Sequence, residues 1–148
     1  AIGHDWSVHM VQFMKGEPFP EYGEISIIRE LDGFSVEQFP TKHFVSEDDV
    51  REQDKRVMQD ALEASRIAVN SSYDMVILDE INVACHFGLI DASEVVELTE
   101  STDCELVLTG RYAPSEVVEK ADIVTRMEKV EHPYDSGDDT DAREGVEW

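Results

Sequence analysis

The sequence predicts an α/β fold, in which a mostly parallel sheet is flanked by helices. Strand-like and helix-like segments alternate along the chain, and this alternation is typical of the class. Two strand-like segments, residues 75–78 and 105–108, consist almost wholly of apolar residues without polar alternation. Strands that helices cover on both faces have this composition, and they form parallel sheets. The chain has 148 residues, and we expect positions 1–148 to form a single domain.

The first part of the chain predicts two strands. Residues 1–6 read like the end of a helix, with Gly3 near its C-terminus, and lead into a strand over residues 8–14. Residues 22–32 are ambiguous, and residues 34–39 predict a second, short strand. Ser46 and the acidic residues after it are a typical helix start, so we expect a helix over residues 46–68. Its apolar face should carry Val57, Ala61 and Ile67.

The second part predicts three more strands and two more helices. After the strand over residues 75–78, Asp91 opens a helix, and the strand over residues 105–108 follows. Pro114 suits the first turn of a short helix that ends near residue 120. Residues 123–130 predict a last strand. We expect residues 131–148 to be a polar, acidic C-terminal tail.

The charge of the chain is strongly negative. It has 12 Lys and Arg residues against 34 Asp and Glu residues, a formal net charge of −22. Such a surface repels nucleic acid and anionic lipid, because contacts with phosphate groups need basic residues. The acidic residues are spread along the whole chain, so we expect a halophilic protein: in molar salt the Debye length falls to about 3 Å and the repulsion is screened.

Other features of the composition predict a cytoplasmic protein. No apolar run approaches the ~20 residues of a membrane span. The two cysteines, Cys85 and Cys104, do not make a disulfide framework, and a reducing compartment is the simplest setting for them.

Two carboxylates follow directly after the apolar strand over residues 75–78. Asp79 and Glu80 should therefore lie at the carboxyl end of a buried parallel strand, the edge at which open α/β sheets bind ligands. Carboxylates there can hold Mg²⁺, which takes oxygen ligands and bridges phosphate groups. The alternative interpretation is that both residues only cap the next helix.

A hydroxyl, a glycine and a cation follow the next strand, as Thr109, Gly110 and Arg111. The planar guanidinium of Arg111 suits a phosphate group, although, taken alone, an ion pair with one of the many acidic residues is the better explanation. Lys15, just after the first strand, has the same two interpretations. No segment has the G-x-x-x-x-G-K-[ST] pattern of a phosphate loop, so we expect this chain to bind ATP poorly.

Several segments in order resemble the ATP:corrinoid adenosyltransferases of the P-loop type. They are residues 11–16 (VQFMKG), 22–24 (YGE), 75–80 (MVILDE), 108–114 (LTGRYAP), 121–124 (ADIV), 132–135 (HPYD) and 142–147 (AREGVE). The resemblance covers essentially the whole chain and implies a P-loop NTPase (RecA-like) fold. Members of the family begin with a strand, a phosphate loop and a helix that ends at a segment similar to residues 1–4. On this basis we expect the chain to be N-terminally incomplete.

The resemblance also implies an activity, in which the 5′-deoxyadenosyl group of ATP moves to the Co(I) of a corrinoid and triphosphate leaves. Glu80 would bind Mg²⁺ with support from Asp79, and Thr109 and Arg111 would lie near the nucleotide, with Lys15 as a further candidate. Some members displace the lower cobalt ligand with an aromatic pair, Phe-x-Trp. Phe44 fits its first position, but Ser46 stands in place of the tryptophan. A reductase and a second copy in a homodimer are the partners that the resemblance suggests.

Two alternative functions remain open at this point. One is a non-catalytic corrinoid-binding or regulatory module that has the fold without the phosphate loop. The other is a different nucleotide-dependent enzyme on the same scaffold, which would use the same strand-end residues.

Overall fold

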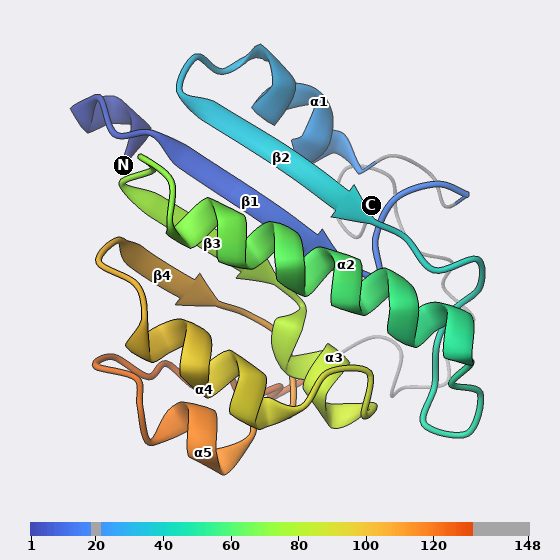
Figure 1. The fold of residues 1–148 in the computed structure, drawn as a ribbon. Coiled ribbons are helices and arrows are strands. Elements are labelled where there is room, and N and C mark those ends of the chain that lie inside the picture. Colours follow the sequence, from blue (N-terminus) through green and yellow to red (C-terminus); the bar gives the residue numbers. More distant parts are fainter. Residues whose placement is uncertain (19–21, 132–148) are drawn as a thin grey trace.

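The structure is a computed structural model that describes residues 1–18 and 22–131. A four-stranded sheet lies at its centre, with the strand order β2-β1-β3-β4 (Figure 1). All neighbouring strands are parallel, as the sequence predicts. The strands are β1 (Val8–Phe13), β2 (Phe34–Phe39), β3 (Met75–Asp79) and β4 (Glu105–Leu108).

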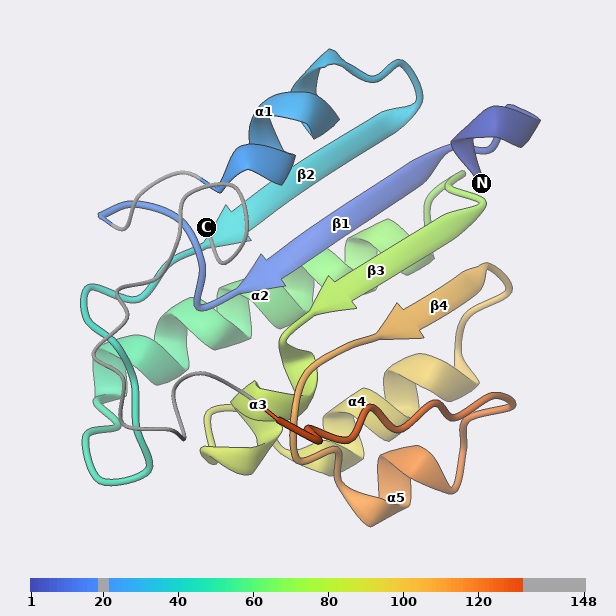
Figure 2. The same cartoon turned by 180° about the vertical axis from the view of Figure 1, so that it is seen from behind.

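Helices cover the two faces of this sheet. Because side chains alternate along a strand, Met10 of β1 faces the opposite side from Val11 and Phe13. Met10 packs in one apolar cluster with α1 (Gly23–Glu30), while Val11 and Phe13 join a larger cluster with α2 (Glu52–Val69). The long helix α2 lies in front of the sheet in Figure 1 and behind it in the reverse view of Figure 2.

Shorter elements complete the described chain, and most of them fit the predictions. The first residues form a 3₁₀ turn, η1 (Ile2–His4), where the sequence predicts a helix end. Asp91 begins α4 (Ala92–Glu100) with a capping box that it forms with Glu94. Pro114 precedes α5 (Ser115–Val118), and α3 (Ile81–His86) directly follows β3. The ambiguous residues 22–32 include α1.

The predicted start of the long helix was wrong, and its predicted buried face was right for Ala61 but wrong for Ile67. Helix α2 begins at Glu52, because the Asp54 carboxylate accepts a hydrogen bond of 3.0 Å from the backbone N–H of Arg51 and caps the helix there. Its buried face carries Met58, Ala61, Leu62 and Ser65, whereas Ile67 is 62% exposed. Apolar spacing alone did not specify which stripe of the helix meets the sheet.

The predictions for the last strands also need correction. Strand β4 lies at the edge of the described sheet, so it is only partly covered rather than buried on both faces. Residues 123–130 form no strand, because no described strand pairs with them. Their apolar residues are exposed, and Met127 and Val130 are more than 90% exposed. The predicted tail over residues 131–148 lies, after its first residue, outside the described residues.

Candidate functional site

The carboxyl ends of three strands meet at one edge of the sheet. In the strand register, Gln12 of β1 lies beside Asp79 of β3, and Leu78 of β3 lies beside Leu108 of β4. Thr109 therefore follows β4 at the level of Asp79. The predicted neighbourhood of these strand ends is present in the structure.

Asp79 is the centre of a hydrogen-bonded network. Its Oδ2 accepts hydrogen bonds from Gln12 Nε2 and from Lys15 Nζ, each at 3.0 Å. Its Oδ1 accepts a hydrogen bond of 2.8 Å from the Thr109 hydroxyl. Gln38 Nε2 in turn donates to Gln12 Oε1 at 2.8 Å. Residues from all four strands or their ends thus hold one carboxylate in a fixed orientation.

The sequence analysis missed the two glutamines of this network. Gln12 is 1% exposed in a strand whose six residues are all buried. A buried amide needs partners, since leaving it without hydrogen bonds costs free energy. A glutamine inside an apolar strand was therefore an available signal, but its partner Asp79 is 67 residues away in the sequence.

Lys15 forms an ion pair with Asp79 and lies over an aromatic ring. Its Nζ is 5.5 Å from the centre of the Tyr22 ring. Burial opposes the charge of Lys15, but the Asp79 carboxylate, aided by Glu80 and Glu24, raises the pKa of Lys15 above its ordinary value. Lys15 therefore stays charged at neutral pH. Of the two interpretations of Lys15, the ion pair is present in the structure, and a role with phosphate stays a prediction.

Glu80 has a different environment from Asp79. Its backbone is left-handed, with φ of 67°, and its N–H donates a hydrogen bond of 3.0 Å to the Thr109 hydroxyl. It occupies the N-cap position of α3 without a side-chain capping bond, so the interpretation of Glu80 as a simple helix cap does not describe it. Within the described ranges, no hydrogen-bond partner is found for the Glu80 carboxylate.

The loop after β4 is packed tightly against Glu80. Gly110 has φ of 117°, and a Cβ at this position would lie 3.3 Å from the Cα of Glu80. Only glycine adopts this backbone conformation without strain. The backbone N–H of Asn82 also donates to the carbonyl of Thr109 at 3.2 Å. Backbone contacts, as well as the Thr109 hydroxyl, therefore hold the ends of β3 and β4 together.

Arg111 and Phe44 lie outside the network around Asp79. Arg111 is exposed, and its guanidinium carbon is 5.5 Å from the centre of the Tyr112 ring. In the part of the chain that the structure describes, Arg111 forms no ion pair with an acidic residue. Phe44 is 81% exposed, between β2 and α2, and its neighbour Val45 is buried. The predicted roles of both residues remain predictions.

The donor set at this edge fits a divalent cation only in part. Both oxygens of Asp79 already accept hydrogen bonds, whereas Glu80 could offer its carboxylate. Residues 1–18 and 22–131 contain no group of three or more His, Cys, Asp or Glu side chains arranged to hold a metal ion. A cation bound through Glu80 would therefore need other oxygen ligands, such as those of a nucleotide.

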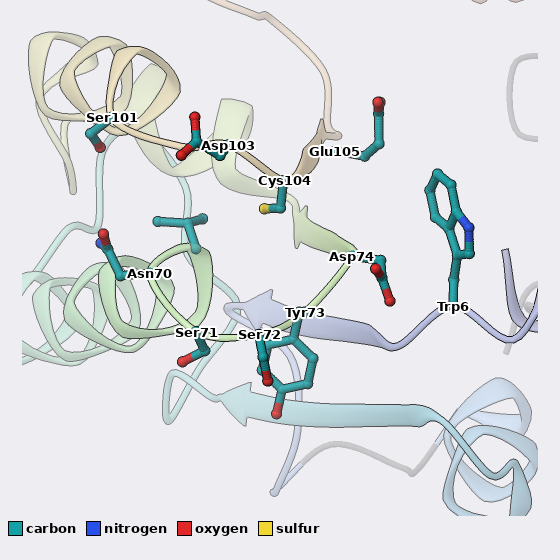
Figure 3. Close-up of a pocket in the computed structure, with 11 residues that line it drawn as sticks. Trp6, Asn70, Ser71, Ser72, Tyr73, Asp74, Ser101, Asp103, Cys104 and Glu105 are labelled. Atoms are coloured by element: carbon teal, nitrogen blue, oxygen red, sulfur yellow. The ribbon is translucent and has the colours of Figure 1, made fainter.

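A hollow of about 530 Å³ lies elsewhere, at the opposite edge of the sheet. Figure 3 shows side chains that line it, and they come from the segments before β3 and β4 and from residues at the ends of α2 and α4. Tyr73, Asp74, Asp103 and Glu105 are among them. The hollow is open and does not include any predicted site residue.

Among the helices that the structure describes, none combines the length and the apolar composition that a membrane span requires.

The model of the family "ATP:corrinoid adenosyltransferase BtuR/CobO/CobP" matches residues 1–148. A corrinoid adenosyltransferase from Sinorhizobium is 36% identical over 153 residues, which cover 99% of this chain and 69% of the relative. One from Escherichia coli K12 is 31% identical over 140 residues, which cover 93% and 69%. One from Pseudomonas aeruginosa is 29% identical over 151 residues, which cover 100% and 72%. The chain belongs to the ATP:corrinoid adenosyltransferase family.

Proposed function

We propose that the protein transfers the 5′-deoxyadenosyl group of ATP to the cobalt of a corrinoid. The observation that carries this proposal is the family match over the whole chain, together with the fixed acid, hydroxyl and cation at the carboxyl edge of the sheet. Ligands bind at this edge in open α/β sheets.

The reaction is a nucleophilic substitution. Co(I) donates an electron pair to the 5′ carbon of ATP, a cobalt–carbon bond forms, and the carbon–oxygen bond to the triphosphate breaks. The triphosphate leaves with the bonding electron pair. The protein must therefore hold cobalt and carbon in line and stabilise the charge of the leaving group.

The residues at the sheet edge can divide this work. The Glu80 carboxylate would hold Mg²⁺, which, when bound, neutralises charge on phosphate oxygens. Asp79 orients the Lys15 ammonium and the Thr109 hydroxyl toward the same edge. Arg111, which is exposed two residues after Thr109, would bind phosphate oxygens. Phe44 would contact the corrinoid from the segment before α2.

The setting of the reaction is also part of the proposal. A Co(I) corrinoid needs a reductant, and a reductase is the partner that would supply electrons. Both cysteines are free thiols, which fits a reducing cytoplasm. We also propose a homodimer, which the resemblance to the family suggests.

Because the net charge is −22, we expect a halophilic protein whose melting temperature rises steeply with KCl concentration. A flat or falling curve would contradict a halophilic origin.

The test is the formation of adenosylcobalamin. The assay uses the full-length protein. ATP, MgCl₂, KCl and chemically reduced cobalamin are supplied, and the product is followed by absorbance. We expect one triphosphate for each adenosylcobalamin. ATP hydrolysis without adenosylcobalamin would indicate another nucleotide-dependent enzyme, and corrinoid binding without turnover would indicate a non-catalytic module.

A further inference from the structure

His86 lies where three segments at the carboxyl edge of the sheet meet. It is the last residue of α3, the short helix that begins after Glu80. Its Nε2 is 2.6 Å from a carboxylate oxygen of Glu47, which belongs to the segment between β2 and α2. Its ring also stacks on Tyr112, with ring centres 4.3 Å apart and an angle of 30° between the planes.

Each of these contacts leads to a residue with a proposed binding role. Glu47 is three residues from Phe44, the candidate contact of the corrinoid. Tyr112 is adjacent to Arg111, whose guanidinium lies against the same tyrosine ring. The helix that carries His86 is anchored in the core, because its first four residues are buried, and His86 itself is exposed at its end. A single imidazole thus connects the corrinoid side of the proposed site with the nucleotide side.

The backbone conformation of Tyr112 indicates that specific contacts hold this residue beside His86. Its φ of 61° is left-handed, a conformation that costs free energy for a bulky residue. The ring is 59% exposed, so burial in a core does not explain the strain. Stacking on His86 and the contact with Arg111 are the interactions that offset it.

We propose that His86 is a positioning residue, which holds the segment that contains Phe44 and the loop that contains Arg111 in fixed positions relative to each other. The inference rests on the proposed function for the identity of the two substrates. The close contact of the imidazole Nε2 with the Glu47 carboxylate would fix the Phe44 segment, and the stack with Tyr112 would fix the Arg111 loop. The two contacts use different properties of the imidazole, so substitutions can separate them.

The test is a set of four substitutions in the product of the whole reading frame, with KM measured for cobalamin and for ATP. His86→Phe keeps an aromatic ring against Tyr112 but loses the contact with Glu47, so the KM for cobalamin should rise about five-fold. Glu47→Gln should also raise the KM for cobalamin. Tyr112→Leu should raise the KM for ATP about five-fold and leave that for cobalamin unchanged. His86→Ala should raise both.

A matched control is Lys120→Gln, which removes an ion pair of similar exposure between the segment after α5 and the end of α4 and should change neither KM. If Glu47→Gln and Tyr112→Leu affect both substrates equally, or if His86→Ala affects neither, His86 does not position the two segments. Melting temperatures within about 2 °C of the parent would show that general unfolding is not the cause.

Hydrogen exchange separates the failure of this inference from the failure of the proposed function. Without substrates, His86→Phe should increase deuterium uptake in residues 40–51 but not in residues 109–114. His86→Ala should increase it in both segments. A parent protein that forms no adenosylcobalamin would refute the function alone. Unchanged uptake in both segments of His86→Ala would refute the positioning role, whatever the activity.

Discussion

The two edges of the sheet differ in what their polar residues do. At the carboxyl edge, Gln12, Lys15, Asp79 and Thr109 interlock through hydrogen bonds of 2.8 to 3.0 Å. At the amino edge, polar residues line an open hollow of about 530 Å³, and the Asp74 carboxylate accepts hydrogen bonds of 2.8 Å from the N–H and the hydroxyl of Ser7, which join the segments before β1 and β3.

The presence of a hollow alone therefore does not decide which edge carries the proposed function. The described residues that line the hollow at the amino edge include no Lys or Arg, whereas Lys15 lies at the carboxyl edge. At the carboxyl edge, hydrogen bonds to Asp79 hold the side chains of Gln12, Lys15 and Thr109 in fixed orientations. Preorganised charge is what catalysis requires, so we place the function at the carboxyl edge.

The largest expected effect is on activity at the carboxyl edge. Glu80→Gln removes a charge but almost no volume, and kcat for adenosylcobalamin formation should fall about 100-fold, in the range seen when one preorganised electrostatic contact is lost. The matched control is Glu105→Gln at the amino edge, which lines the hollow. Its kcat should stay within about two-fold of the parent. If kcat falls equally in both variants, the two edges of the sheet do not differ in their contribution to activity.

A second effect concerns stability at the junction of β3 and β4. Gly110→Ala should lower the free energy of unfolding by about 2 kcal/mol, because the new Cβ meets the Glu80 backbone and φ stays positive. Gly3→Ala, at the other end of the molecule, has no atom within 4 Å of the new Cβ and should have little effect. Chemical denaturation measures both. A neutral Gly110→Ala would mean that the loop after β4 is not held against Glu80.

Removal of the Thr109 hydroxyl should lower the free energy of unfolding by less than the Gly110 substitution does. Thr109→Val keeps the shape of the side chain but leaves Asp79 Oδ1 and the Glu80 N–H without this partner, which should cost about 1.5 kcal/mol of stability. Thr109→Ser keeps the hydroxyl and should be close to the parent in denaturation experiments. If serine and valine behave alike, the hydrogen bonds are not what joins the two strands.

The smallest effect is a pH dependence near the amino edge. His9 is buried, accepts or donates a hydrogen bond of 2.7 Å with Ser35 and stacks on Tyr73, which lines the hollow. Burial lowers the pKa of His9, and the Glu37 carboxylate only partly opposes this. The unfolded chain therefore binds a proton at higher pH than the folded chain does. Stability should be complete above about pH 6.5 and decrease as the pH falls below it.

The variant His9→Gln should flatten this dependence in melting temperatures measured between pH 5 and pH 8 in the same buffer salt. Activity at neutral pH should not change, because His9 lies away from the carboxyl edge. An unchanged pH dependence in His9→Gln would assign it to other groups.

Much of the candidate site could be predicted because strand ends are local features. The apolar run before Asp79 and the one before Thr109 identified two parallel strands, and parallel strands bring their carboxyl ends to one edge. The contact of Asp79 with Thr109 followed from this rule. The contacts of Gln12 and His86 were missed, because their partners lie far away in the sequence, although a glutamine inside an apolar strand was a local signal for Gln12.

The sequence by itself determined the class of the fold, the parallel strands and the acidic surface, since each depends on local composition and periodicity. The tertiary structure decided which stripe of α2 is buried, that residues 123–130 pair with no described strand, and how Asp79 differs from Glu80. These depend on neighbours that are distant along the chain. Two adjacent carboxylates look alike in a sequence, but three donors saturate Asp79, while within the described residues the Glu80 carboxylate has no hydrogen-bond partner.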